Sequence, residues 1–340
     1  MSTKFSDGLN FAGKQTPTRL FNMARTYTSF QTSKLSSNVV HHGMPVSISI
    51  EPTTSCNLRC PECPSGLRSF TRPTGMMKKE LFESVITQLA PSLSYLIFYF
   101  QGEPYLHPHL LEMIKLVSTK NIYTATSTNA HYLSDEAAKE TVKSGLDRLI
   151  ISLDGTTQET YQSYRIGGKL DKVIEGTKNI LRWKKELKSK TPHVIFQFLV
   201  VKHNEHQIED VKKLAKALGV DEVKLKTAQI YDFENGSELI PANEKYSRYK
   251  KNSEGKYSIK NGLLDECWKM WHSCVVTWDG KVVPCCFDKD AHIVLGDLNK
   301  NSFDEIWKGE KYNQFRQSLF NSRSEIEMCR NCTEGAKVFA

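Results

Sequence analysis

The chain has 340 residues, 39% hydrophobic and 25% charged, which is enough for one large domain with a smaller attachment. No apolar run approaches the roughly 18 residues that span a bilayer, and the N-terminus lacks the apolar segment of a secretion signal, so we expect a soluble, cytoplasmic protein without a membrane partner. The net charge is +8, but the basic residues are spread along the chain and concentrate only in 169–190, which is typical of a solvated helix face and predicts no nucleic-acid partner.

Residues 1–44 form a polar N-terminal extension, in which we expect one short helix near Arg19 to Tyr27. Over 45–230, short β-branched or aromatic runs alternate with longer amphipathic stretches, the pattern of βα units around a parallel sheet. The six predicted strands are Val46 to Glu51, Tyr95 to Phe100, Ile122 to Thr126, Arg148 to Leu153, Val194 to Val201 and Glu222 to Thr227. The predicted helices are Lys78 to Leu89, Pro108 to Thr119, Ser134 to Ser144, Leu170 to Leu187 and Glu205 to Leu218. Six units are too few for a closed eight-stranded barrel, so we predict an α/β fold with a partial (βα)6 TIM-like barrel.

The rest of the chain divides into a connector and a small module. Residues 231–266 are polar and turn-rich, which is typical of a connector. Residues 267–340 contain the hairpin signal CVVTWDGKVVPCC, with Asp279 and Gly280 at its turn, and a later amphipathic stretch from Ser302 to Phe320. We therefore predict a C-terminal module made of a β-hairpin and a helix.

Three cysteines, Cys56, Cys60 and Cys63, follow the first predicted strand. The chain has nine cysteines, an odd number, and no export signal, which favours metal or cluster ligation over disulfides. Three thiolates can hold three irons of a 4Fe-4S cluster and leave the fourth iron open for catalysis. A zinc site is the alternative, but structural zinc needs a fourth ligand and none lies nearby in the sequence.

The loop Cys56-x3-Cys60-x2-Cys63 after a first strand resembles that of the radical S-adenosylmethionine (SAM) superfamily. The resemblance implies that the open iron chelates SAM and that one electron, from a donor such as flavodoxin or ferredoxin, cleaves it. The 5′-deoxyadenosyl radical so formed would remove a hydrogen atom from the substrate. Glu62 departs from the family, which often has an aromatic residue there, close to the adenine.

Residues at the ends of later strands resemble the family's SAM-binding positions. Gly102, Glu103 and Pro104 are similar to the Gly-Glu motif that meets the SAM amino group, and a carboxylate can bind an ammonium. Arg165 resembles the arginine that reaches the SAM carboxylate or ribose, although a surface ion pair is the alternative. Small polar residues at the strand ends suit ribose hydroxyls or, alternatively, open the next helix; they are Ser127, Asn129, Ser152 and Asp154.

A second group of cysteines resembles the start and finish of a SPASM or shortened twitch extension; its members are Cys267, Cys285, Cys329 and Cys332. Four thiolates close one auxiliary 4Fe-4S cluster, and too few cysteines remain for another. Cys286 is an alternative ligand, whereas Cys274 fits a buried small hydrophobe. The spacing alone leaves a four-cysteine zinc site as the alternative.

These features predict a radical SAM oxidoreductase or maturase that modifies a peptide or protein side chain. The alternative is a dehydrogenase or epimerase of a sugar-like small molecule, because a single auxiliary cluster resembles that of aminoglycoside-type alcohol dehydrogenases. A non-catalytic iron-sulfur or zinc scaffold is a remote alternative, since the cysteine loop and the Gly-Glu motif are both intact. The catalytic base stays unassigned; Glu205, Lys226 and Asp232 fit surface or structural roles equally well.

Overall fold

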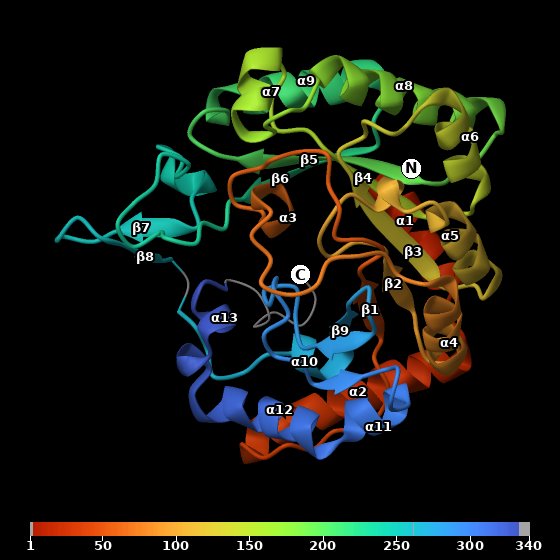
Figure 1. Cartoon of the computed structure of the whole chain (residues 1–340), viewed down its shortest axis with the longest axis vertical. Helices are drawn as coiled ribbons and strands as arrows, with labels where there is room; N and C mark the ends of the chain where they lie inside the picture. Colours follow the sequence, from red (N-terminus) through yellow and green to blue (C-terminus); the bar gives the residue numbers. More distant parts are fainter. Residues whose placement is uncertain (1–2, 261, 333–340) are drawn as a thin grey trace.

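A nine-stranded sheet runs through the computed structural model, which describes residues 3–260 and 262–332 (Figure 1). Its order is β11-β10-β9-β1-β2-β3-β4-β5-β6, and β1 to β6 pair in parallel with their chain neighbours. These six strands are β1 Ser47–Ile50, β2 Tyr95–Ile97, β3 Tyr123–Thr128, β4 Arg148–Ser152, β5 His193–Val200 and β6 Glu222–Thr227. The predicted parallel α/β arrangement is therefore confirmed.

Helices fill the connections between these strands and cover the outer face of the sheet (Figure 1). They are α4 Lys79–Leu89, α5 Leu110–Thr119, α6 Asp135–Lys143, α7 Gln158–Tyr164, α8 Leu170–Glu186 and α9 Ile208–Leu218. The sequence prediction missed α7, which is too short to show a full amphipathic period and begins at a Thr157 cap. Apolar side chains such as Phe82, Phe98 and Phe196 are fully buried between helices and sheet. Each such burial stabilises the fold by about 1.5–3 kcal/mol.

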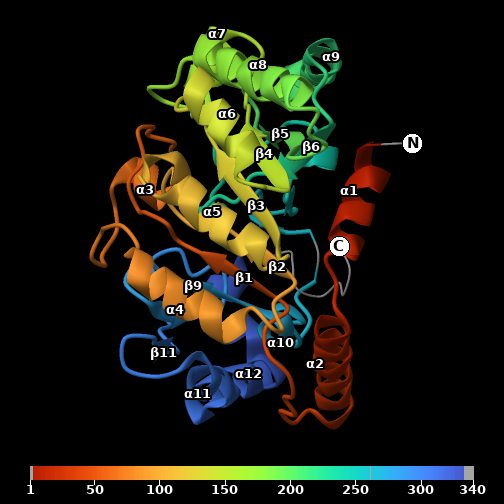
Figure 2. The same cartoon turned by 90° about the vertical axis from the view of Figure 1, so that its right-hand side faces the viewer.

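The N-terminal extension contains two helices, α1 Thr3–Gly13 and α2 Pro17–Ser36, where the sequence predicted only one short helix. The inner face of α2 is polar, and this hides the expected amphipathic pattern. Arg19 is 3% exposed and donates to backbone carbonyls of Ala90, Lys120 and Asn121 at 2.5–3.1 Å. Figure 2 shows both helices along one side of the molecule.

The C-terminal hairpin has the predicted position and consists of β9 Ser273–Val276 and β10 Lys281–Val283, followed by β11 Gly296–Asp297. Its turn needs a glycine, because Gly280 has φ +85°. Strand β9 also pairs in parallel with β1, so the hairpin continues the sheet of the barrel. The predicted helix from Ser302 to Phe320 is two helices, α11 Phe303–Lys308 and α12 Glu310–Ser322, because Gly309 has an extended backbone that interrupts them.

The connector carries a small two-stranded sheet, β7 Tyr249–Lys251 and β8 Tyr257–Ile259, at one side of the molecule (Figure 1). Short helices α10 Lys269–His272 and α13 Glu327–Arg330 place the first and last cysteines of the second group. Residues 333–340 of the predicted C-terminal module lie outside the described residues. In the described part of the chain, no helix has the length and apolar character needed to cross a membrane.

Candidate iron-sulfur and SAM site

The three cysteines of the first group lie between β1 and the short helix α3 Pro64–Leu67, at the carboxyl end of β1. Cys56, Cys60 and Cys63 all line one cavity of about 140 Å³. Gly66 keeps this turn compact, since a Cβ there would lie 2.5 Å from the backbone nitrogen of Cys60. The geometry therefore places three thiols on one cavity, and no fourth cysteine is among the described residues that line it.

Burial raises the pKa of the Cys56 thiol to about 12, and it also raises the pKa of Cys60. Both groups are thiols in the absence of a metal, so binding iron must displace their protons. Arg165 opposes this shift at Cys60, because its Nη1 lies 3.6 Å from the Cys60 sulfur. Arg165 thus offsets part of the cost of ionising Cys60 when iron binds.

The same cavity brings together most of the predicted SAM-binding residues, from the ends of β2, β3 and β4 and the segments that follow them. The predicted residues that line it are Gly102, Glu103, Ser127, Asn129, Ser152 and Arg165. Leu58, Tyr99 and Phe100 provide apolar walls. Pro104 and Asp154 do not line the cavity. A small polar-lined space beside three thiols is an arrangement that fits an iron-bound amino acid.

Glu103 is 2% exposed and is held by three hydrogen bonds. Its Oε1 accepts from the Thr128 hydroxyl at 2.7 Å and the Tyr105 N–H at 3.2 Å, and its Oε2 accepts from the Asn129 N–H at 2.8 Å. Burial raises the pKa of this carboxyl. Gly102 precedes it with φ +76°, and a Cβ there would lie 2.2 Å from the Thr53 carbonyl oxygen. The glycine is therefore required to bring Glu103 to the cavity.

Asp154 differs from its predicted role as a ribose ligand. It is fully buried, its Oδ2 accepts from Arg165 Nε at 2.5 Å, and its Oδ1 accepts from the Leu199 N–H at 2.7 Å. Both oxygens are thus engaged within the protein, and Asp154 instead holds the Arg165 guanidinium toward the cysteines. Pro104 only begins a short turn after Glu103, with no exposed polar group to offer.

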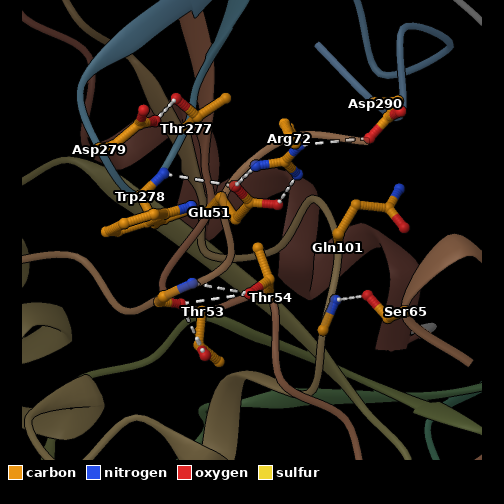
Figure 3. Close-up of polar contacts among 12 residues, drawn as sticks. Glu51, Thr53, Thr54, Ser65, Arg72, Gln101, Thr277, Trp278, Asp279 and Asp290 are labelled. Atoms are coloured by element: carbon orange, nitrogen blue, oxygen red, sulfur yellow. Dashed lines mark hydrogen bonds and ion pairs between the residues drawn. The ribbon is translucent and has the colours of Figure 1, made fainter. Parts of the chain in front are cut away.

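A polar network beside the cysteine loop was missed in the sequence (Figure 3). Arg72 donates to both oxygens of Glu51, at 2.6 and 2.9 Å, and its side chain is 10% exposed. Glu51 also accepts from the Trp278 N–H at 3.3 Å, and Asp290 lies 4.0 Å from Arg72 Nε. The network ties the segment after Cys63 to β1 and to the C-terminal hairpin. One indication of this network was present in the sequence, the charged residue Glu51 at the end of a predicted strand.

The second cysteine group also meets at one narrow cavity, lined by Cys267, Cys285, Cys329 and Cys332. Arg323 lines it too and donates to the Cys332 sulfur at 3.4 Å. Although burial opposes its charge, the neighbouring thiols Cys267 and Cys332, as thiolates, raise the pKa of Arg323. This positive charge would stabilise a set of thiolates on bound iron.

The remaining cysteines of the module lie elsewhere. Cys274 is 1% exposed and packs in the main hydrophobic core, in agreement with its prediction as a small hydrophobe. Cys286 is exposed and does not line the four-cysteine cavity. Within residues 3–260 and 262–332, no His, Cys, Asp or Glu group of three or more is arranged to hold a metal ion. In a 4Fe-4S cluster each cysteine binds a different iron, so the thiols surround a body larger than a single metal ion.

Comparison with known families agrees with this geometry. Residues 50–215 match the profile of the Radical SAM superfamily, and residues 267–333 match that of SPASM, an iron-sulfur cluster-binding domain. The chain is a radical SAM enzyme with a SPASM domain. The cofactors of this radical SAM enzyme are accordingly SAM, a 4Fe-4S cluster and an auxiliary iron-sulfur cluster.

Several characterised proteins resemble the radical SAM enzyme over most of its length. It is 27% identical to the tungsten-containing aldehyde ferredoxin oxidoreductase cofactor-modifying protein of Pyrococcus furiosus, over 78% of this chain and 82% of the relative. It is 25% identical to the PqqA peptide cyclase of Rhodopseudomonas palustris, over 81% of this chain and 76% of the relative. The crystal structure of anSMEcpe with AdoMet and the Cp18Cys peptide has the same fold, with a TM-score of 0.58 at 18% identity, covering 87% of this chain and 92% of that one.

Proposed function

We propose that this radical SAM enzyme modifies a side chain of a peptide or protein. The observation that carries the proposal is a cavity of about 570 Å³ whose walls include residues next to both cysteine groups in the sequence, such as Pro64 beside Cys63 and Met328 beside Cys329. Pro64 and Leu67, from the helix that follows Cys63, line one side of it. Phe287 and Met328 line another side, and both of them also line the four-cysteine cavity.

The size and walls of this cavity suit a peptide segment. Ligand sites usually occupy about 300–1,000 Å³, and they combine apolar walls with a few polar groups. Here Tyr231 and Phe233 supply aromatic surface, and Gln229 supplies a hydrogen-bonding side chain. A side chain inserted here would approach the SAM cavity across α3 and the auxiliary cysteines across Phe287. We expect the substrate to bind at this position.

The proposed roles of the cofactor-binding residues follow from their positions. When bound, the cluster and SAM supply a 5′-deoxyadenosyl radical that can remove a hydrogen atom. Cys56, Cys60 and Cys63 would hold the three protein-bound irons. Glu103 would accept hydrogen bonds from the SAM ammonium with its remaining lone pairs, and Arg165 would donate to the carboxylate. Ser127, Asn129 and Ser152 would bind the ribose.

In the SPASM domain, the proposed ligands of the auxiliary cluster are Cys267, Cys285, Cys329 and Cys332. Their shared cavity and the adjacent Arg323 support the assignment. A cluster with four protein ligands has no open iron, so we expect it to transfer electrons and not to bind SAM. Two similar proteins have a peptide in their names, the PqqA peptide cyclase and anSMEcpe with the Cp18Cys peptide. These names also support a peptide substrate.

The radical chemistry can be tested with anaerobically reconstituted protein, SAM and dithionite. We expect 5′-deoxyadenosine to form, and Cys60→Ala to abolish it. Cys274→Ala is the matched control, because this cysteine lies in the core and should leave SAM cleavage intact. Continued 5′-deoxyadenosine formation by Cys60→Ala would contradict the cluster assignment.

The substrate class needs a separate test. Heat-treated extract of the source cells, divided at about 1 kDa, can be added to the reconstituted enzyme and the rate of 5′-deoxyadenosine formation measured. We expect stimulation by the larger, protease-sensitive fraction. Stimulation by the small-molecule fraction alone would favour a dehydrogenase or epimerase instead, and would overturn the peptide proposal.

A further inference from the structure

Lys289 lines the cavity of about 570 Å³, and its ammonium group lies close to an aromatic ring and a carbonyl oxygen. Its Nζ lies 4.6 Å from the centre of the Tyr231 ring and 3.5 Å from the Glu62 carbonyl oxygen. Across residues 3–260 and 262–332, no carboxylate forms an ion pair with it within 4.0 Å. A partly buried ammonium with such partners keeps the capacity to bind an anion.

The acidic residues beside Lys289 are occupied by other groups. Asp288 is 3% exposed and accepts from the His292 and Ile293 N–H groups, both at 2.8 Å. Asp290 accepts from the Thr71 N–H at 3.0 Å and from the Thr71 hydroxyl at 2.5 Å. The carboxylates of Asp288 and Asp290 are thus hydrogen-bonded to groups other than Lys289.

The outer part of the cavity carries charges of both signs. Glu234, Glu327, Arg330 and His292 all line it and are exposed to solvent. Solvent screens exposed charges strongly, whereas a partly buried ammonium interacts at a lower effective dielectric constant. Asp288 and Asp290 also line the cavity away from solvent, but their oxygens are held by the hydrogen bonds described above, whereas the Lys289 ammonium is a partly buried positive charge that can meet an incoming anion.

Glu62 explains how Lys289 is positioned. The carboxylate of Glu62 accepts from the Tyr231 N–H at 3.0 Å, which holds the Tyr231 ring under the ammonium, while its carbonyl accepts from Lys289. This is the position at which the sequence departs from the family's usual aromatic residue. Burial lowers the pKa of Lys289, with Cys63 and Glu62 opposing this, so an incoming anion would favour the charged form.

We propose that Lys289 binds a carboxylate of the substrate and selects peptides that carry one close to the modified side chain. The inference rests on the proposed peptide substrate and specifies its chemistry. The carboxylate is an Asp or Glu side chain or the C-terminus of the peptide. Lys289 determines specificity by binding the substrate, with Glu62 and Tyr231 as its positioning residues.

The test is selection of displayed random peptides on the reconstituted holoenzyme with SAM bound, for the wild type and for Lys289→Gln. We expect wild-type protein to enrich acidic peptides, and Lys289→Gln to bind the selected peptides at least about tenfold more weakly, the scale for losing a charge-assisted contact. Lys289→Arg should keep the preference. Lys256→Gln, at an exposed lysine in the β7–β8 turn, is the matched control and should behave as wild type.

Two libraries, one with a free and one with an amidated C-terminus, distinguish the sources of the carboxylate. Loss of binding on amidation assigns the C-terminus, and enrichment of Asp or Glu in both libraries assigns a side chain. Peptides without acidic groups, or equal binding by Lys289→Gln, overturn the proposal while leaving the peptide function intact. A wild-type protein that forms 5′-deoxyadenosine but retains no peptide overturns the peptide substrate as well. Iron content and 5′-deoxyadenosine formation without substrate verify that each variant is folded.

Discussion

The two cysteine groups differ in what surrounds their sulfurs. Cys56, Cys60 and Cys63 border a cavity that also contains a fixed carboxylate and an arginine, so there is room for a further ligand. The four later cysteines border a narrow cavity with apolar neighbours such as Met270 and Leu319. The first arrangement suits a cluster that binds a small molecule, and the second suits a cluster that only exchanges electrons. The number of thiols and the size of the adjacent space, about 140 Å³ at the first group and about 10 Å³ at the second, support the same distinction.

The largest expected effect separates the two groups by cysteine replacement. Cys56→Ala should reduce 5′-deoxyadenosine formation to background, because three thiolates are the minimum for the open cluster. Cys329→Ala should still cleave SAM. It should lose the iron of the auxiliary cluster, and it should no longer form the modified substrate. Iron counting and chromatography of the nucleoside products measure both. If Cys56→Ala and Cys329→Ala lose SAM cleavage equally, the proposed difference between the two cysteine groups is wrong.

Removal of the Arg72 guanidinium tests the connection between the two groups. Arg72→Leu should lower the free energy of unfolding by about 3–5 kcal/mol, because it leaves the buried Glu51 carboxylate without its partner. Burial already raises the pKa of Glu51, against the effect of Arg72. Chemical denaturation of the anaerobic protein gives the value. Glu51→Leu combined with Arg72→Met is the control and should recover much of the loss.

Glu103→Gln should weaken SAM binding by about 10- to 100-fold, the scale for one hydrogen bond to a charged group. Burial raises the pKa of Glu103, so its carboxylate becomes protonated at a higher pH than that of an exposed glutamate. In the wild type, SAM affinity should therefore fall as pH falls through this raised pKa. Equilibrium dialysis at several pH values measures it. A wild-type profile that matches that of Glu103→Gln would contradict the role of the carboxylate.

The smallest effect concerns the auxiliary site alone. Arg323→Gln should make the auxiliary cluster harder to reduce, because a positive charge beside its sulfurs is lost. For one electron, a shift of about 59 mV corresponds to a tenfold change in the equilibrium. Redox titration followed by electron paramagnetic resonance measures the two clusters separately. An equal shift at both clusters would show that Arg323 does not act locally.

The sequence predicted the parts of the fold that depend on local pattern. Alternating apolar and polar runs located β1 to β6, and cysteine spacing located both groups of thiols. Contacts between distant segments were not predictable in this way. The ion pair of Asp154 with Arg165 and that of Arg72 with Glu51 depend on how the loops meet. The polar inner face of α2 satisfies backbone carbonyls of the barrel, which no periodicity of hydrophobic residues can reveal.

The parallel pairing of β9 with β1 has a consequence for synthesis of the chain. Until residues 273–276 have left the ribosome, β1 has a neighbour on one side only, at β2. An unpaired strand edge promotes association with other chains. A fragment that ends before β9 would keep every βα unit of the barrel and still expose this edge. We therefore expect the fragment to aggregate, and the hairpin to protect the growing barrel as well as to carry an auxiliary cysteine.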